Sequence, residues 1–252
     1  MASGVVCQSI SRVGVTEPFE LQVARGQITG HSTTNIYGTQ SGAGNTYLPM
    51  WEGGVAYVYP TVAAQMHLSS SVNAGADLTA TILIQGLDAS YNQISETLAL
   101  NGTTPVTTVK SYFRINSMSV ATGVPTGNIL LQDLTDTTLY ARINAGNGRT
   151  QMSLFTVPAG YTFYLSRINA YSSLNSSGSE YAIYRNYSVS STGVVNVTQQ
   201  APFTESYNAL RIMPRPFSEK TDIQLQARTS TATTAWIAIA GEGFLIKNDG
   251  AL

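Results

Sequence analysis

Few residues of this chain have side chains suited to covalent or metal chemistry, and their spacing matches no catalytic set. Cys7 is the only cysteine, and His31 and His67 are the only histidines. A single cysteine excludes an internal disulfide, and a nucleophilic cysteine needs a base that neither histidine's sequence context provides. We therefore interpret Cys7 as a small apolar packing residue.

The sequence pattern also lacks metal-binding and nucleotide-binding motifs. Asp133 and Asp136 are close in sequence, but their loop lacks the repeated oxygen ligands of a calcium site. His67 has no partners at the spacing of a zinc site. The glycine-rich stretch 31–54 matches neither the dinucleotide fingerprint nor the P-loop, and we expect it to be a loop.

The sequence contains few features of a hydrolase. No Gly-x-Ser-x-Gly nucleophile elbow occurs. A carboxylate pair that hydrolyses glycans is assembled in space rather than along the chain, so this alternative stays open although the chain has only 14 acidic residues. We predict that the protein is not an enzyme and needs no metal and no cofactor.

Three aromatic residues are the candidate contact site for a partner. Trp51, Tyr57 and Tyr59 lie close together, and aromatic side chains at a sheet edge stack on sugars or anchor a protein partner. The alternative is that Trp51, beside Pro49 and Met50, caps the core at a packed corner.

The composition favours strands and burial against neighbours. The chain is 43% hydrophobic but only 11% charged, against about 25% charged in an ordinary soluble domain. A surface of Ser, Thr, Asn and Gln suits strands, and it suits permanent assembly because few long charged side chains must be desolvated and ordered. The alternative is an extracellular type of β protein with an ordinary hydroxyl-rich surface.

Charge and hydropathy exclude two classes of partner. The net charge is −1 and no basic run occurs, so we expect no direct nucleic-acid partner, since phosphate neutralisation needs clustered Lys and Arg. No apolar run approaches the roughly 18–20 residues that span a bilayer, and the amino terminus lacks the pattern of a signal peptide. We therefore expect no membrane insertion, and a cytoplasmic location until assembly.

The elements that would position these residues are strands. Residues 79–115 contain three segments with apolar side chains at alternate positions, which is the pattern of half-buried strands, and Asn101-Gly102 is a favoured tight-turn dipeptide. We expect a run of antiparallel strands here. The other predicted elements are two strands in 19–30, strands at 55–59 and 65–72, two in 116–136, a hairpin around 158–160, a strand pair in 180–200, a loop-like stretch at 202–216, and two strands in 219–248.

The predicted fold is all-β, with two tandem antiparallel β-sandwiches of jelly-roll-like topology. Residues 1–19 are expected to form an extended amino-terminal arm. Residues 20–140 would form the first sandwich and residues 141–252 the second, because Gly and Asn accumulate at 141–149 and the hydrophobic pattern restarts after them.

Three phrases carry a resemblance to a known family. IQGLDASYNQISETLALNGTTPVTT, FTVPAGYTFYL and EKTDIQLQA resemble a family of virion structural proteins of tailed, often marine, bacteriophages, and the similarity extends over residues 20 to 248. The resemblance implies a particle component, and none of its motifs is catalytic. The implied location is the virion, after synthesis in the host bacterial cytoplasm.

This resemblance and the composition lead to one functional expectation and one alternative. We expect a non-enzymatic structural component that attaches to or reinforces the particle as head decoration, neck or tail and fibre part. Its expected partners are capsid, neck or tail subunits and further copies of itself, a trimer being favoured over a two-fold dimer. The alternative is an adhesion module of the same particle that binds a receptor or a host surface glycan.

Overall fold

The computed structural model describes residues 11–12, 15–174, 179–231 and 233–248. Within these ranges the fold is all-β with several antiparallel sheets, which confirms the predicted fold class at that level. Cys7 and most of the predicted arm 1–19 lie outside the described ranges. The jelly-roll topology stays a prediction.

The strands and helices follow the chain with bounds that differ from several sequence expectations. Their bounds are β1 Ser11–Arg12, β2 Val15–Thr16, α1 Phe19–Ala24, β3 His31–Ala43, β4 Leu48–Pro49, β5 His67–Ser70, the 3-10 helix η1 Gly75–Leu78, β6 Thr81–Leu87, β7 Gln93–Ala99, β8 Val106–Thr107, β9 Arg114–Thr122, β10 Ile129–Gln132, β11 Leu139–Ile143, β12 Leu154–Thr156, β13 Tyr161–Ser172, β14 Ala182–Val189, β15 Val195–Phe203, β16 Ser206–Phe217, β17 Asp222–Thr229 and β18 Ala235–Lys247.

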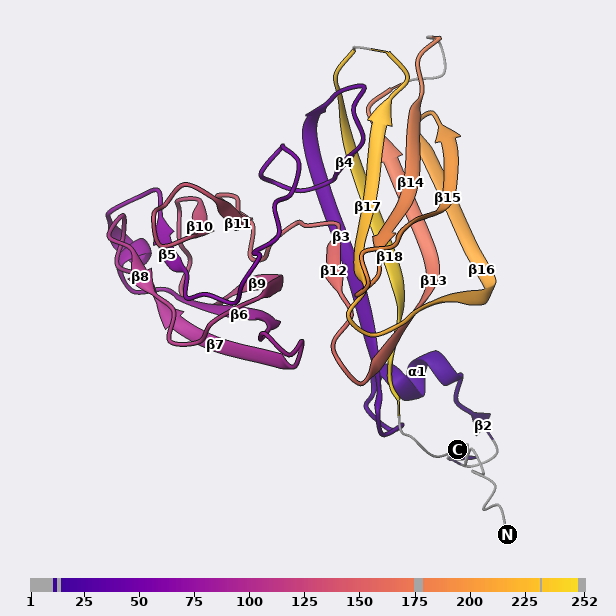
Figure 1. Cartoon of the computed structure of the whole chain (residues 1–252), viewed down its shortest axis with the longest axis horizontal. Coiled ribbons are helices and arrows are strands. Elements are labelled where there is room, and N and C mark those ends of the chain that lie inside the picture. The colour runs from indigo at the N-terminus through magenta and orange to yellow at the C-terminus, as the bar shows by residue number, and fades with distance from the viewer. Residues whose placement is uncertain (1–10, 13–14, 175–178, 232, 249–252) are drawn as a thin grey trace.

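Two of the sheets share one core, and together they form what we call the large unit (Figure 1). Their strand orders are β16-β13-β18-β3 and β12-β17-β14-β15, with β4 also paired to β17. Fully buried residues from both sheets meet between them, for example Phe163 on β13, Tyr184 on β14, Leu225 on β17 and Ile239 on β18.

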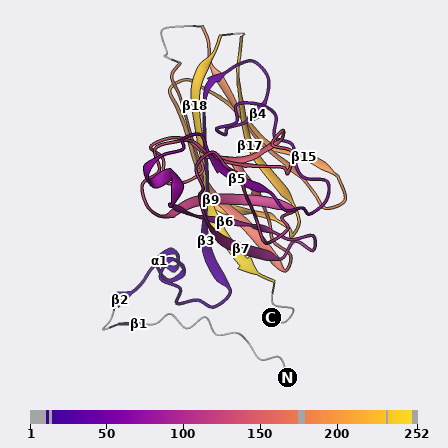
Figure 2. The ribbon, with the colours of Figure 1, turned by 90° about the vertical axis from the view of Figure 1, so that its left-hand side faces the viewer.

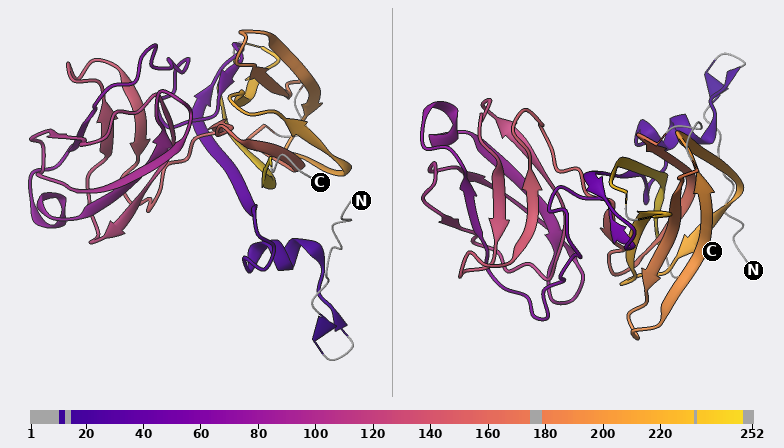
Figure 3. Two further views of the ribbon diagram at one scale, coloured as in Figure 1. Left: turned by 60° about the horizontal axis from the view of Figure 1, so that its bottom comes forward. Right: turned by 90° about the horizontal axis from the view of Figure 1, so that it is seen from above.

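Two further sheets share a second core and form the small unit, which lies beside the large unit in Figure 3. Their strand orders are β11-β10-β5-β8 and β7-β6-β9. Leu68, Ile82, Ile84, Met118 and Ile129 are fully buried in this core. All sheet strands of the small unit lie between β4 and β12 in the chain, so the small unit is inserted into the large one.

The predicted ranges 20–140 and 141–252 therefore do not separate the two cores. Strand β3 pairs antiparallel with β18 along almost its whole length, with Ile36 opposite Gly241, and Ile36, Ala43 and Met50 lie in the core of the large unit. Alternation along a strand shows that one face is buried but not which core buries it. The division by sequence order missed the discontinuity for this reason.

Strand β3 corrects the expectation of a loop at 31–54. Gly38 lies inside the strand, and a β carbon there would be 1.9 Å from the carbonyl oxygen of Met50 and 2.3 Å from the amide nitrogen of Ser153. This glycine allows two backbones to approach closely, whereas Gly42 takes a φ of +78° near the strand end. Glycine content alone does not distinguish a loop from a strand that another backbone approaches closely.

Other elements also differ from expectation. Helix α1 replaces a predicted strand. Pro18 precedes it and supplies the carbonyl that accepts from the amides of Leu21 and Gln22. Figure 2 shows the helix beside one end of β3. Residues 55–59 form no strand, and 202–216, expected as a loop, contain the end of β15 and most of β16.

Strands β12 and β13, expected as a hairpin, belong to different sheets because the turn at Gly160 leads from one layer to the other.

The central expectation of antiparallel strands in 79–115 is confirmed for its first two segments. Strand β6 pairs with β7 on one side and β9 on the other, and Ile82 and Ile84 on β6 are fully buried. Gly102 takes the positive φ of +59° that the turn requires. The third strand begins only at Arg114, and Val109, which lies within the third alternating segment of the sequence, is 79% exposed.

A buried carboxylate fastens the loops of the small unit. Asp77 in η1 accepts the hydroxyl of Ser70 at 2.6 Å, the amide and the hydroxyl of Thr126 at 2.8 and 2.9 Å, and the amide of Gly127 at 3.0 Å. Burial raises the pKa of Asp77, but these hydrogen bonds outweigh it and hold the pKa below its ordinary value. The carboxylate thus joins η1 to the turn before β10.

Candidate functional site

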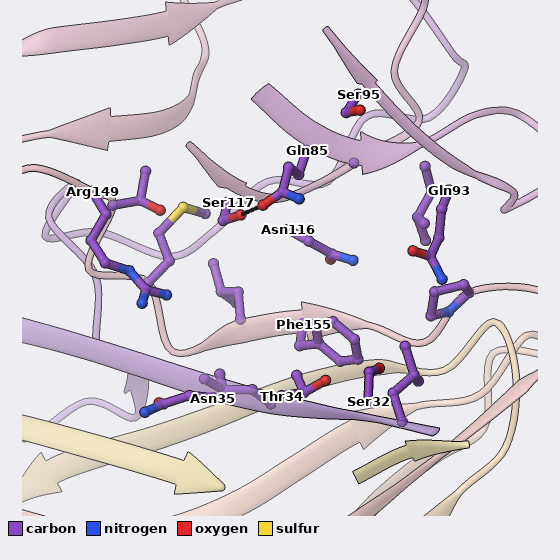
Figure 4. A pocket seen from close by; sticks show the side chains of 18 of the residues that line it. Ser32, Thr34, Asn35, Gln85, Gln93, Ser95, Asn116, Ser117, Arg149 and Phe155 are labelled. Carbon is purple, nitrogen blue, oxygen red and sulfur yellow. Dashed lines mark hydrogen bonds between the residues drawn. The ribbon is translucent and has the colours of Figure 1, made fainter. Parts of the chain in front are cut away.

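A polar groove of about 390 Å³ lies between the two units (Figure 4). One wall is the edge strand β3, and the opposite wall consists of β6, β7 and β9 of the small unit. Figure 4 shows Arg149 at one end, Gln93 at the other, and Phe155 between them on the floor. The labelled polar lining residues are Ser32, Thr34, Asn35, Gln85, Gln93, Ser95, Asn116, Ser117 and Arg149.

Both walls contribute polar side chains to the groove. Ile36 is buried in the core of the large unit, whereas Ser32 and Asn35 are exposed and Thr34 is half-buried. On the other wall Gln85 is exposed although Ile84 before it is fully buried. On β6 the groove thus receives the polar side of a half-buried strand, whereas on β3 Ser32 and Thr34 lie on the same side as Ile36.

The loop that carries Arg149 is held by a single carboxylate. Glu52 accepts the amide of Asn144 and the amide of Gln151, both at 3.3 Å, and the side-chain amide of Asn147 at 2.9 Å. Burial raises the pKa of Glu52 above its ordinary value, against the lowering effect of these bonds. Arg149 itself is exposed and forms no ion pair with any described residue.

The floor of the groove is fixed by a side chain that bridges the units. The side-chain nitrogen of Asn116 on β9 donates to the carbonyl of Thr156 at 3.1 Å, and its oxygen accepts the amide of Thr156 at 2.9 Å. This pair imitates a β-ladder contact between the small unit and β12. Asn116 is thereby committed to structure and offers less to a ligand.

A buried ion pair joins the units behind the groove. Arg114 of the small unit donates from Nε and Nη2 to the two carboxylate oxygens of Asp222 at 2.9 and 3.0 Å, and both residues are 8% exposed. Nη1 donates to the carbonyls of Pro60 and Phe113 at 3.1 and 2.8 Å, and Thr156 donates to Asp222 at 2.5 Å. Burial lowers the pKa of Arg114, but Asp222 outweighs it and the pKa lies above its ordinary value.

The three aromatic residues selected from the sequence form a chain of ring contacts that ends at this ion pair. The ring of Tyr59 is 4.7 Å from the Arg114 guanidinium carbon and packs edge-on against Tyr57 at 4.8 Å, which packs edge-on against Trp51 at 5.1 Å. Trp51 is 1% exposed and donates to the carbonyl of Val55 at 2.6 Å. Trp51 thus occupies the core, as the alternative interpretation proposed, and Tyr57 and Tyr59 are half-buried.

Sequence reasoning missed Arg114, Asp222 and Arg149. One available signal was the phrase Phe113-Arg114-Ile115, since a charged residue within an apolar alternating pattern needs a buried partner. Its partner lies 108 residues away along the chain, so the sequence offered no way to select it.

A second surface candidate is the edge strand β16. Leu210 is 71% exposed, Ile212 97% and Met213 85%. In the pairing with β13, Leu210 is opposite Arg167 and Arg215 is opposite Leu165. Residues 211–214 therefore face a single residue of β13 and bulge outward. We call residues 210–214 the β16 ridge.

Side chains connect the β16 ridge to the edge of the other sheet. Arg211 donates to the side-chain oxygen of Gln199 on β15, and Arg215 donates to the carbonyl of Thr198 at 3.2 Å. Val195 and Val197 on β15 are 53% and 49% exposed. The two sheet edges thus share one side of the large unit with several exposed apolar side chains.

The residues considered for metal binding make other contacts. Nδ1 of His67 lies 2.8 Å from a carboxylate oxygen of Asp136, and Asp133 accepts the amides of Thr135 and Thr137 at 3.2 and 2.9 Å. No group of three or more His, Cys, Asp or Glu side chains suited to a metal ion occurs in the described ranges. Of the helices the structure describes, none is long and apolar enough to cross a membrane.

Comparisons with known proteins give only distant matches. No protein-family model and no curated protein match the chain. Among solved structures, the chain is similar to proteins of infectious bursal disease virus. For the T13 viral particle the identity is 9%, with 86% of this chain and 70% of that chain covered and a TM-score of 0.26. For the VP2 subviral particle the identity is 10%, with 88% of this chain and 74% of that chain covered and a TM-score of 0.25. These similarities are too low to assign a fold family or a function.

Proposed function

We propose that this chain is a non-enzymatic structural component of a virion, which attaches to or reinforces the particle through contacts between subunits. The observation that carries the proposal is the β16 ridge, where Leu210, Ile212 and Met213 are 71%, 97% and 85% exposed. Contiguous exposed apolar side chains on a folded protein mark an interaction surface.

The β16 ridge is large enough for a weak contact, which becomes strong only when a subunit makes several contacts in a particle. Full burial of one large aliphatic side chain contributes about 1.5–3 kcal/mol, so burial of three contributes about 4.5–9 kcal/mol. Association of two molecules costs about 4–15 kcal/mol in lost freedom. One ridge alone therefore gives weak binding, whereas a subunit held at several contacts in a particle binds far more strongly.

The form of the ridge favours side-chain packing over the addition of a strand. Pro214 and Pro216 lack backbone donors, and the bulge at 211–214 interrupts the edge ladder. A neighbour would therefore receive Ile212 and Met213 in a pocket rather than extend the sheet.

The finer assignment rests on the sequence. The resemblance to structural proteins of tailed bacteriophages supports a head-decoration, neck or tail position, with synthesis in the bacterial cytoplasm followed by incorporation into the virion. The low charged fraction of 11% supports self-association, with a trimer favoured over a two-fold dimer.

The test compares the association of ridge and control variants. We expect the wild-type chain to self-associate weakly in sedimentation equilibrium, at concentrations approaching about 1 mM, and the double variant Ile212→Ser, Met213→Ser to stay a monomer under the same conditions. The control is Val109→Ser, Val124→Ser, which removes apolar side chains that are 79% and 81% exposed on the small unit and should associate as wild type does. A wild-type monomer, or a ridge variant that associates like wild type, overturns the proposal.

A second candidate function has its own observation. The polar groove between the units is a concave site at an interface of two folded bodies, where ligand sites commonly lie. This favours a receptor- or glycan-binding module of the particle as the alternative.

A further inference from the structure

The groove between the units has a lining chemistry that defines its ligand. Its side chains are mainly hydroxyls and amides, and within the part of the chain that the structure describes no lining residue is Asp, Glu or His. Pockets for drug-like or lipid ligands are lined mainly by apolar groups, so this groove suits a strongly polar ligand. Its volume of about 390 Å³ falls in the usual range of ligand sites.

Several of these polar groups are available to a ligand. Gln93 and Thr34, on opposite walls, form no side-chain hydrogen bond with any residue in the described ranges. Gln85 uses its oxygen to accept from Ser117 at 3.0 Å, which leaves its amide nitrogen for another acceptor. Amides and hydroxyls both donate and accept, as the hydroxyl groups of a sugar do.

Among the described residues that line the groove, Arg149 alone carries a positive charge. It is exposed, it has no carboxylate partner within the described part of the chain, and the bonds of Glu52 hold its loop. A guanidinium is suited to bidentate binding of a carboxylate. A single cation does not suffice for the phosphates of a nucleic-acid strand, which require clustered basic residues.

We propose that this groove binds an oligosaccharide that contains a carboxylate sugar. Arg149 pairs with the carboxylate, Gln85 and Gln93 hydrogen-bond to hydroxyl groups, and the half-buried ring of Phe155 packs against a sugar face. The ligand is bound without cleavage, since glycoside hydrolysis needs two carboxyl groups and the described lining residues supply none. This inference rests on the second candidate function, the glycan-binding module, whose ligand class it names, and it does not depend on the β16 ridge.

The test uses calorimetric titration of the full chain with carboxylated oligosaccharides. The probes are tetragalacturonate, a mannuronate tetramer, a hyaluronan tetramer and sialyllactose, and the matched neutral probe is methyl-esterified tetragalacturonate. We expect saturable binding of at least one acidic probe, which Arg149→Gln weakens about ten- to a hundred-fold, the range for loss of a charge-assisted hydrogen bond. Gln93→Ala should weaken it to a smaller extent.

The control is Arg167→Gln. Arg167 lies away from this groove and pairs with Glu242 at 3.7 Å, so this variant removes the same charge and should bind like wild type. Circular dichroism should show all three variants folded, since Arg149 and Gln93 are exposed.

Three results would overturn the proposal. The first is an absence of saturable binding of every acidic probe up to about 10 mM, near the weak limit of specific binding. The second is an equal loss of binding in the Arg149 and Arg167 variants, which would indicate a general charge effect. The third is binding of an extended peptide in the groove that Arg149→Gln leaves unchanged, since such a peptide would be recognised by the edge of β3 instead.

Discussion

Replacing Arg114 by methionine tests whether the buried ion pair holds the two units together. Methionine keeps most of the side-chain volume but removes both hydrogen bonds to Asp222 and both to the carbonyls of Pro60 and Phe113. Asp222 then remains 8% exposed with only the Thr156 hydroxyl as a side-chain donor. An uncompensated buried charge of this kind costs about 3–5 kcal/mol of unfolding free energy, whereas loss of an exposed pair costs about 0–1 kcal/mol.

Urea unfolding at neutral pH measures this difference. The chain has two tryptophans; Trp51 is buried in the small unit and Trp236 is 43% exposed on β18. In a Trp236→Phe background, fluorescence therefore reports the small unit, and far-ultraviolet circular dichroism reports both units. We expect Arg114→Met to lower the midpoint for Trp51 and to separate the two signals.

The matched control removes both charges. Because replacement of a whole buried ion pair by apolar side chains is often nearly neutral, the double variant Arg114→Met, Asp222→Leu should regain at least half of the lost stability. A cost below about 1 kcal/mol for the single variant would mean that the pair behaves like an exposed one. The proposed role in joining the units would then be wrong.

Two further changes probe the small unit and β3. Asp77→Asn should cost about 2–4 kcal/mol, measured by urea unfolding, because the side-chain nitrogen then faces either the amide of Thr126 or the buried amide of Gly127, which are both donors. The pKa of Asp77 is held below 3.8 in the folded state. The stability that the Asp77 carboxylate contributes is therefore present above pH 3.8 and is lost as the pH falls through the lowered pKa. Acid should lower the melting temperature of Asp77→Asn less than that of the wild-type chain, and an equal decrease would count against this role of Asp77. Gly38→Ala should lower the melting temperature strongly or prevent folding, because the new β carbon would lie 1.9 Å from the carbonyl oxygen of Met50. The control is Gly148→Ala, whose β carbon would have no atom within 4 Å, and this variant should change the unfolding free energy by under about 0.5 kcal/mol. Similar melting temperatures for these two alanine variants would contradict the close approach of the backbones at β3.

Much of the local structure follows from the sequence, because side-chain alternation in a strand is a local property. The period of two at Ile82 and Ile84, the positive φ at Gly102, and the β14 and β15 pair all agree with what the pattern predicts. The scarcity of charged residues likewise indicated an all-β chain. Gly38 misled the prediction at β3, because glycine serves loops and close strand packing equally.

The position of the site depends on tertiary structure. The groove combines β3, which belongs to the large unit, with β6, β7 and β9 of the inserted small unit and with the loop of Arg149. Arg114 finds Asp222 across 108 residues of chain. The residues themselves determine that strands form and which of their faces are polar. Only the packing of both cores determines which polar faces meet, because burial in a core is not directional and strand pairing reaches across any distance in the sequence.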